Sequence, residues 1–100
     1  MNNITAVSQI TSQDLVDYIR IDEVTEDDLN TLSTALTIAK VYVAEYTGRT
    51  IAELDAYRDI IIVILILCQD MYDNRVLYVD KSNINKVVES ILNLHSVNLL

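Results

Sequence analysis

The sequence predicts an all-α fold, a small bundle of about four helices around one very apolar helix. Two observations point to this class. The chain has no proline and a single glycine, Gly48, which favours long helices joined by short turns. Between Tyr57 and Arg75, apolar residues recur at spacings of three and four, which is the period of a helix.

The expected central helix covers residues 55–74 and contains nine consecutive apolar residues, Ile60–Cys68. Many of them are β-branched and favour strands, yet a strand of this length would far exceed the usual ~5 to 6 residues. Burying a large side chain stabilises by ~1.5 kcal/mol or more, which outweighs the few tenths that β-branching costs a helix. A membrane span needs ~20 apolar residues. We therefore expect a core helix whose every side must be covered.

Two helices are expected before the central one. The first covers residues 13–20, where Thr11 or Ser12 is the N-cap and Asp14 completes a capping box. The second covers residues 26–46, and its apolar residues alternate at spacings of three and four, so it can pack along the central helix.

Cap and stop residues bound this second helix. Thr25 is its N-cap, three acidic residues complement the helix dipole in its first turn, and Gly48 is its left-handed stop. A further capping pattern, Thr50-x-x-Glu53, begins either a short separate helix or an early central helix.

The last helix is expected over residues 83–95, with Ser82 as its N-cap. Residues 76–81 show no helical stripe and are expected to form a short extended piece or a loop. Residues 1–10 are expected to be an extended or poorly ordered arm, and residues 96–100 a tail. The chain is thus one helical domain, in which Ile4, Val7 and Ile10 can dock the arm.

Composition excludes several classes of function. Seven Lys and Arg against fifteen Asp and Glu give a net charge of −8, which repels phosphate backbones and anionic membranes. The lone Cys68 lies inside the apolar run, which is typical of a reducing compartment. The first residues lack the basic and apolar regions of a signal peptide, so we expect a protein made inside the cell.

No catalytic, cofactor or metal site is expected. The acidic residues between Asp14 and Asp28 are explained by capping and solvation, and they form no Ca²⁺ loop. His95 is the single histidine, with no cysteine nearby in sequence and no obvious acid partner, which indicates a residue near the C-terminal dipole of a helix. No nucleophile–histidine pair or phosphate loop is present, so an enzyme is not expected.

Tyr72, Asn74 and Arg75 close the central helix, and capping alone is an adequate explanation for them. Tyr and Arg are also enriched at interfaces, so a partner surface is the competing interpretation. The candidate subunit or portal interface comprises Tyr72, Asn74, Arg75, Arg49, Asp22, Asp27 and Asp28.

Four segments with a common order and spacing cover residues 12–75: Leu15-x-x-Tyr18-Ile19-Arg20-Ile21-Asp22, Asp27-Asp28-Leu29, Ala39-x-x-Tyr42 leading to Tyr46-Thr47-Gly48-Arg49, and Tyr72-x-Asn74-Arg75. Together they resemble the head-to-tail connector (adaptor) proteins of tailed bacteriophages, of the type that forms a ring next to the portal. The chain departs from that pattern by lacking a proline before the central helix and a basic residue at the end of the last helix.

The resemblance implies a structural protein of the virion neck, made in the bacterial host cytoplasm. Its copies would form a ring, expected to be twelve-fold, that binds the portal protein and the next neck or tail-completion protein. DNA would pass through as cargo only. We expect Arg75 or Arg49 to meet the Asp22–Asp28 cluster of an adjacent copy. The alternative is an acidic helical regulator or DNA-mimic inhibitor that binds a basic partner protein.

Overall fold

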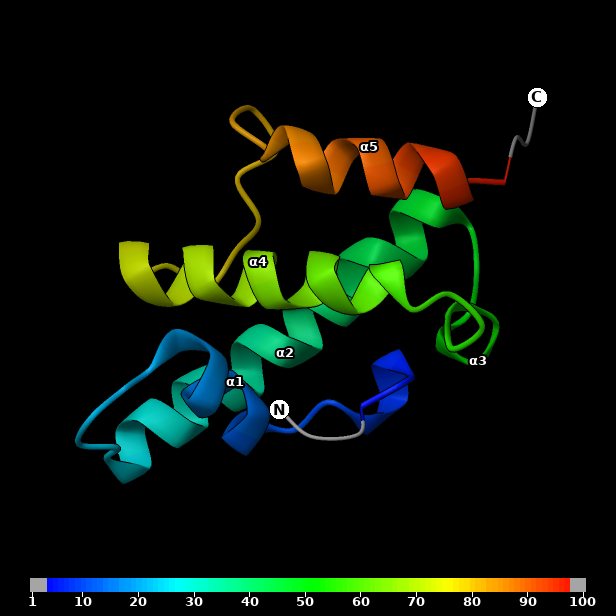
Figure 1. Ribbon diagram of the computed structural model, residues 1–100. Coiled ribbons are helices and arrows are strands. Elements are labelled where there is room, and N and C mark those ends of the chain that lie inside the picture. Colours follow the sequence, from blue (N-terminus) through cyan, green and yellow to red (C-terminus); the bar gives the residue numbers. More distant parts are fainter. Residues whose placement is uncertain (1–3, 98–100) are drawn as a thin grey trace.

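The computed structural model describes residues 4–97 and confirms the all-α class (Figure 1). This range contains no strand; its elements are the 3₁₀ helix η1 (Val7–Gln9) and the helices α1 (Ser12–Ile19), α2 (Glu26–Thr47), α3 (Ile51–Leu54), α4 (Asp59–Asn74) and α5 (Lys86–His95). Helix α4 contacts α1, α2 and α5. In Figure 1, α5 runs antiparallel above α4, α1 lies below it and α2 crosses behind it.

The expected capping box at the start of α1 and the expected N-cap of α2 are both confirmed. Thr11, not Ser12, caps α1, since its hydroxyl accepts the Asp14 N–H and its own N–H donates to the Asp14 carboxylate at 2.7 Å. Thr25 and Asp28 repeat this exchange at the start of α2. Gly48 ends α2 in the left-handed conformation with φ 71°, as expected of the one glycine in the chain.

The Thr50 capping pattern starts a separate short helix, α3, and α4 begins at Asp59 rather than at residue 55. The chain turns between these helices, where the Tyr57 N–H donates to the Leu54 carbonyl at 2.9 Å. The Asp55 carboxylate accepts the backbone N–H and the hydroxyl of Ser8 at 2.9 and 2.7 Å. Asp55 therefore anchors the N-terminal segment instead of extending α4.

The predicted start of the last helix is wrong, because Ser82 does not cap it. The Ser82 hydroxyl donates to Asp80 at 2.8 Å, and the same carboxylate group accepts from Asn83, which holds residues 80–83 in a turn. Asn85 is the N-cap of α5, accepting the N–H groups of Val87 and Val88. The segment 76–81 is a loop, which was one of the two expected alternatives, the other being a short extended piece.

The core covers most of the apolar run on α4. Seven of its nine residues are buried within one chain, namely Ile60, Ile61, Val63, Ile64, Leu65, Leu67 and Cys68. Ile66 is partly exposed, and Ile62 is 48% exposed. The rest of the chain therefore covers this helix on all but a narrow face.

The N-terminal segment contributes to this core. Val7 lies in η1 and is fully buried, and Ile10 is nearly so, whereas an extended or poorly ordered arm was the expectation for residues 1–10. Residues 1–3 of that arm, and residues 98–100 of the predicted tail, lie outside the described residues.

Candidate functional site

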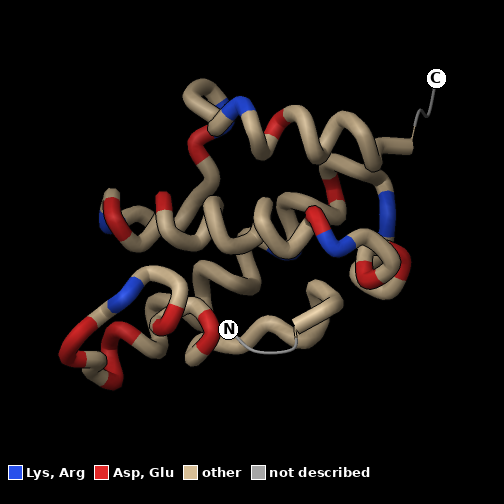
Figure 2. The backbone as a smooth tube through the Cα atoms, in the orientation of Figure 1, with Lys and Arg blue, Asp and Glu red and all other residues tan. Residues whose placement is uncertain are grey.

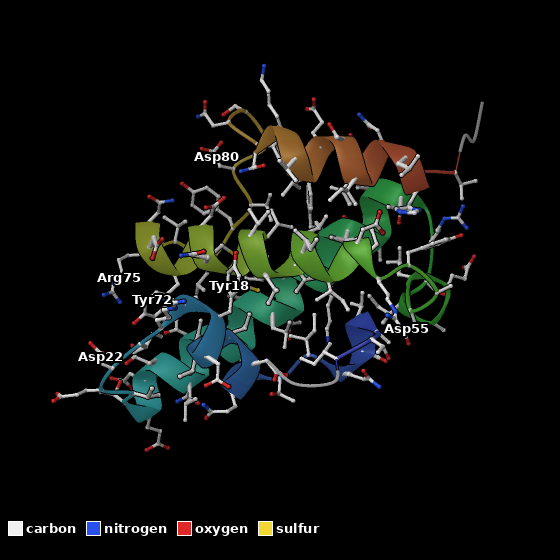
Figure 3. The ribbon with its side chains drawn as sticks, in the orientation of Figure 1. Tyr18, Asp22, Asp55, Tyr72, Arg75 and Asp80 are labelled. Carbon is white, nitrogen blue, oxygen red and sulfur yellow. The ribbon has the colours of Figure 1, made fainter. Side chains whose placement is uncertain are left out.

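Three of the predicted interface residues meet where α4 ends beside the start of α2 (Figure 3). The Tyr72 hydroxyl donates to Asp28 Oδ1 at 3.0 Å, although the two residues are 44 positions apart. The Arg75 guanidinium lies over the Tyr72 ring, 5.0 Å from its centroid. We call Asp28, Tyr72 and Arg75 the junction cluster. It joins two helix ends through one aromatic side chain.

Hydrogen bonds set the charge state of the junction cluster. The pKa of Asp28 is lowered, first by the Thr25 backbone N–H, then by the Tyr72 hydroxyl, with the Arg75 charge adding to the effect. The pKa of Tyr72 is raised, first by burial and then by its bond to the Asp28 carboxylate. At neutral pH the carboxylate is therefore charged and the phenol is a donor.

The backbone of Arg75 is itself unusual. It ends α4 in the left-handed region, with φ 57°, and its N–H donates to the carbonyls of Met71 and Tyr72. The Val76 N–H also returns to the Met71 carbonyl, at 3.1 Å. Arg75 thus acts as the C-cap of α4, while its side chain is exposed beyond the Tyr72 ring.

The other predicted residues are spread over both ends of the molecule. Asp22 and Asp27 are exposed near the start of α2, and Figure 2 shows acidic residues gathered at this tip. The Asn74 amide donates to the Asp70 carbonyl at 2.9 Å within α4. Arg49 lies outside the junction cluster, because its Nε donates to the His95 carbonyl at 2.6 Å.

A second cluster, which the sequence did not predict, surrounds His95. Its Nε2 lies 2.8 Å from Asp59 Oδ1, and its ring stacks on Tyr57 with centroids 4.2 Å apart. The Arg49 guanidinium lies over the same Tyr57 ring at 5.4 Å. The expectation that His95 has no acid partner is therefore wrong. Because Asp59 is 36 positions away, no local pattern marks the pair.

Two further observations concern the thiol and metal-binding side chains of the described residues. Burial raises the pKa of Cys68 to about 12, so the thiol is protonated at neutral pH. Within residues 4–97, no three His, Cys, Asp or Glu side chains come together in a way that would hold a metal ion. Both clusters join elements that are far apart in the sequence.

Comparisons of the chain with models of known protein families, with curated proteins and with solved structures found no match. In the described part of the chain, no helix has the length and apolar character needed to cross a membrane. The residues and their geometry are therefore the basis for a functional proposal.

Proposed function

We propose that the chain is a structural head-to-tail connector of a tailed phage, which forms a ring below the portal and docks the next neck or tail protein. The junction cluster is the observation that carries this proposal. It brings together two of the four segments that resemble the adaptor proteins, because Asp28 belongs to Asp27-Asp28-Leu29 and Tyr72 to Tyr72-x-Asn74-Arg75. The exposed Arg75 guanidinium is available to a neighbouring copy.

In this proposal α4 is the very apolar helix around which each subunit is built, and the ring needs to cover only its remaining open face. Ile62 and Ile66 lie four residues apart on that face. The net charge of −8 suits a channel wall that a DNA polyanion passes without binding.

The proposal is tested by co-sedimentation of the purified chain with rings of its portal protein. We expect the wild-type chain to sediment with the portal at a fixed ratio. Arg75→Glu places a carboxylate beside the acidic tip, and we expect it to abolish ring formation while circular dichroism shows unchanged helix content. Assembly of Arg75→Glu at the wild-type ratio would contradict the proposed role of this residue.

The exposed acidic tip favours a second candidate, an acidic regulator or DNA mimic. Asp22, Glu23, Glu26 and Asp27 are all exposed around the start of α2. Such a protein would bind a basic partner as a monomer or dimer, with an affinity that falls steeply with salt. Salt-sensitive capture of a basic DNA-binding protein, with no binding to portal rings, would favour this candidate over the connector.

A further inference from the structure

An apolar surface on α4 and α5 is exposed in part, on the side away from α2. It comprises Ile62, Ile66, Val87, Ile91 and Leu94, which we call the strip. Leu94 is 74% exposed, Val87 54% and Ile62 48%. Val87, Ile91 and Leu94 are spaced by four and three residues, so they share one face of α5.

The His95–Asp59 pair shows that the two halves of the strip adjoin. It joins the end of α5 to the start of the antiparallel α4 (Figure 1). Ile91 lies one helical turn before His95, and Ile62 lies about one turn after Asp59. Both isoleucines are therefore beside the same seam between α4 and α5.

A second apolar surface forms a shallow, open hollow on α2 and the loop that follows α4. This hollow has a volume of about 280 Å³ and is lined by Ile38, Val41, Tyr42, Glu45, Leu77, Tyr78, Val79 and Lys81. Val41 is 51% exposed, Leu77 48% and Tyr78 60%. These side chains lack cover within the described chain.

The strip and the hollow lie on opposite faces of the molecule. On α2, the buried residues Leu32, Ala39 and Val43 form the stripe that faces the core, and the helical period places Val41 on the other side. On α4, the neighbours α1, α2 and α5 pack against the sides that carry the buried residues, so the exposed Ile62 lies on the side that they leave open.

The two surfaces carry few charges, and the hollow is lined by one charge of each sign, Lys81 and Glu45. Lys81 borders the hollow, with its Nζ 5.9 Å from the Tyr42 ring centroid, and it has no carboxylate partner in the ion pairs of residues 4–97. Asp73 lies eleven residues after Ile62, which is three turns along the same face of α4, and it is exposed. Each copy carries a net charge of −8, so two copies repel each other through most of their surfaces. They can pack together most readily through surfaces that carry few charges.

We propose that the strip of one copy packs into the hollow of the next copy, with Asp73 facing Lys81 across the contact. Because the two surfaces differ, this contact is heterologous and leaves a strip and a hollow unused at the ends of every open assembly. Addition of copies therefore continues until a ring closes. The inference rests on the proposed function, for which it names the partner surface as a second copy of this chain.

Two variants test the pairing by blocking one surface each. Leu94→Asp places a charge on the strip and leaves the hollow unchanged. Val41→Asp places a charge in the hollow and leaves the strip unchanged. Analytical ultracentrifugation should show oligomers for the wild type and a monomer for each variant alone. A mixture of the two should form a 1:1 dimer that grows no further, because one usable pair of surfaces is present.

Val24→Asp is the matched control, because Val24 is an exposed apolar residue outside both surfaces. This variant should assemble like the wild type. Circular dichroism confirms that each variant folds. A wild type that stays monomeric up to millimolar concentration, a variant that oligomerises alone, or a mixture that stays monomeric would each overturn the proposed contact. Dimers of Val41→Asp alone would mean that two strips pack together, which also overturns it.

Exchange of charges gives an independent readout. Lys81→Glu and Asp73→Lys should each self-associate more weakly than the wild type, and an equimolar mixture should regain assembly with alternating chains. Absence of that rescue contradicts the pairing of Asp73 with Lys81. If the chain assembles through these surfaces but does not bind portal rings, the connector function is refuted and the proposed contact stands. If Leu94→Asp and Val41→Asp bind portal rings at the wild-type ratio, the proposed contact is refuted and the connector function stands.

Discussion

At the scale of single residues, three helices end with a left-handed residue, and one of the three is glycine. Gly48 was predictable from its type, whereas Arg20 and Arg75, with φ 64° and 57°, carry no such signal. A left-handed conformation costs a residue with a side chain about 1 to 2 kcal/mol. Arg75 has this unfavourable backbone conformation, and its side chain lies over the Tyr72 ring. The residue therefore has two roles, because it caps α4 and contacts Tyr72 in the junction cluster.

Replacing Arg75 separates these two tasks. Arg75→Gly relieves the backbone conformation and adds freedom to the unfolded chain, so the free energy of unfolding should change by less than about 1 kcal/mol. Assembly should be impaired, because the guanidinium is gone. Urea denaturation measures the first effect and sedimentation the second. Arg20→Gly is the control. Its change in the free energy of unfolding should match that of Arg75→Gly, and it should assemble like the wild type. A loss above about 2 kcal/mol in Arg75→Gly would show that the side chain stabilises the fold itself.

The carboxylates make the fold sensitive to acid. The pKa of Asp28 is lowered from an ordinary value of 3.8, chiefly by the Thr25 N–H and the Tyr72 hydroxyl. A lowered pKa in the folded state gives stability that is complete above about pH 4 and is lost as the pH falls through the folded value. Tyr72→Phe should raise the pKa of Asp28 and weaken this acid dependence. Carboxyl titration by NMR measures it, and an unchanged Asp28 pKa would contradict the bond between the two side chains.

At the scale of elements, the sequence predicted those helix ends that local chemistry determines. The N-caps Thr11 and Thr25 each bond to a residue three positions further on, and both are present as predicted. The start of α4 was predicted too early because Asp55 bonds to Ser8, 47 positions away. The start of α5 was predicted too early because the Ser82 side chain bonds to Asp80 instead of capping the helix. Both bonds are local, and the residue type of Ser82 does not decide between them.

The corrected start of α5 leads to a paired prediction. Asn85→Ala should lower the free energy of unfolding by about 1 kcal/mol, because two N–H groups of the first turn lose their acceptor. Ser82→Ala should cost less, since that side chain bonds in an exposed turn. Thermal unfolding of the two variants gives the comparison. A larger loss in Ser82→Ala would contradict the assignment of Asn85 as the N-cap.

At the scale of the whole molecule, the fold class was predictable from composition and periodicity, and the candidate site was predictable in part. Asp28, Tyr72 and Arg75 do meet, but within one chain, and Arg49 belongs to the His95 cluster at the other end of α4. Such contacts depend on how helices pack, which spacing along the chain does not encode. Packing also buries more of α4 than its composition indicated, which leaves the strip and the hollow as the apolar surfaces that a second copy can cover.

Electron microscopy of portal rings mixed with an excess of the purified chain tests the central claim most directly. We expect an added ring of density on one face of the portal, with copies related by the portal's own rotational symmetry and with the α4–α5 face of each copy against α2 of the next. Portal particles without added density at saturating concentrations of the chain would contradict it.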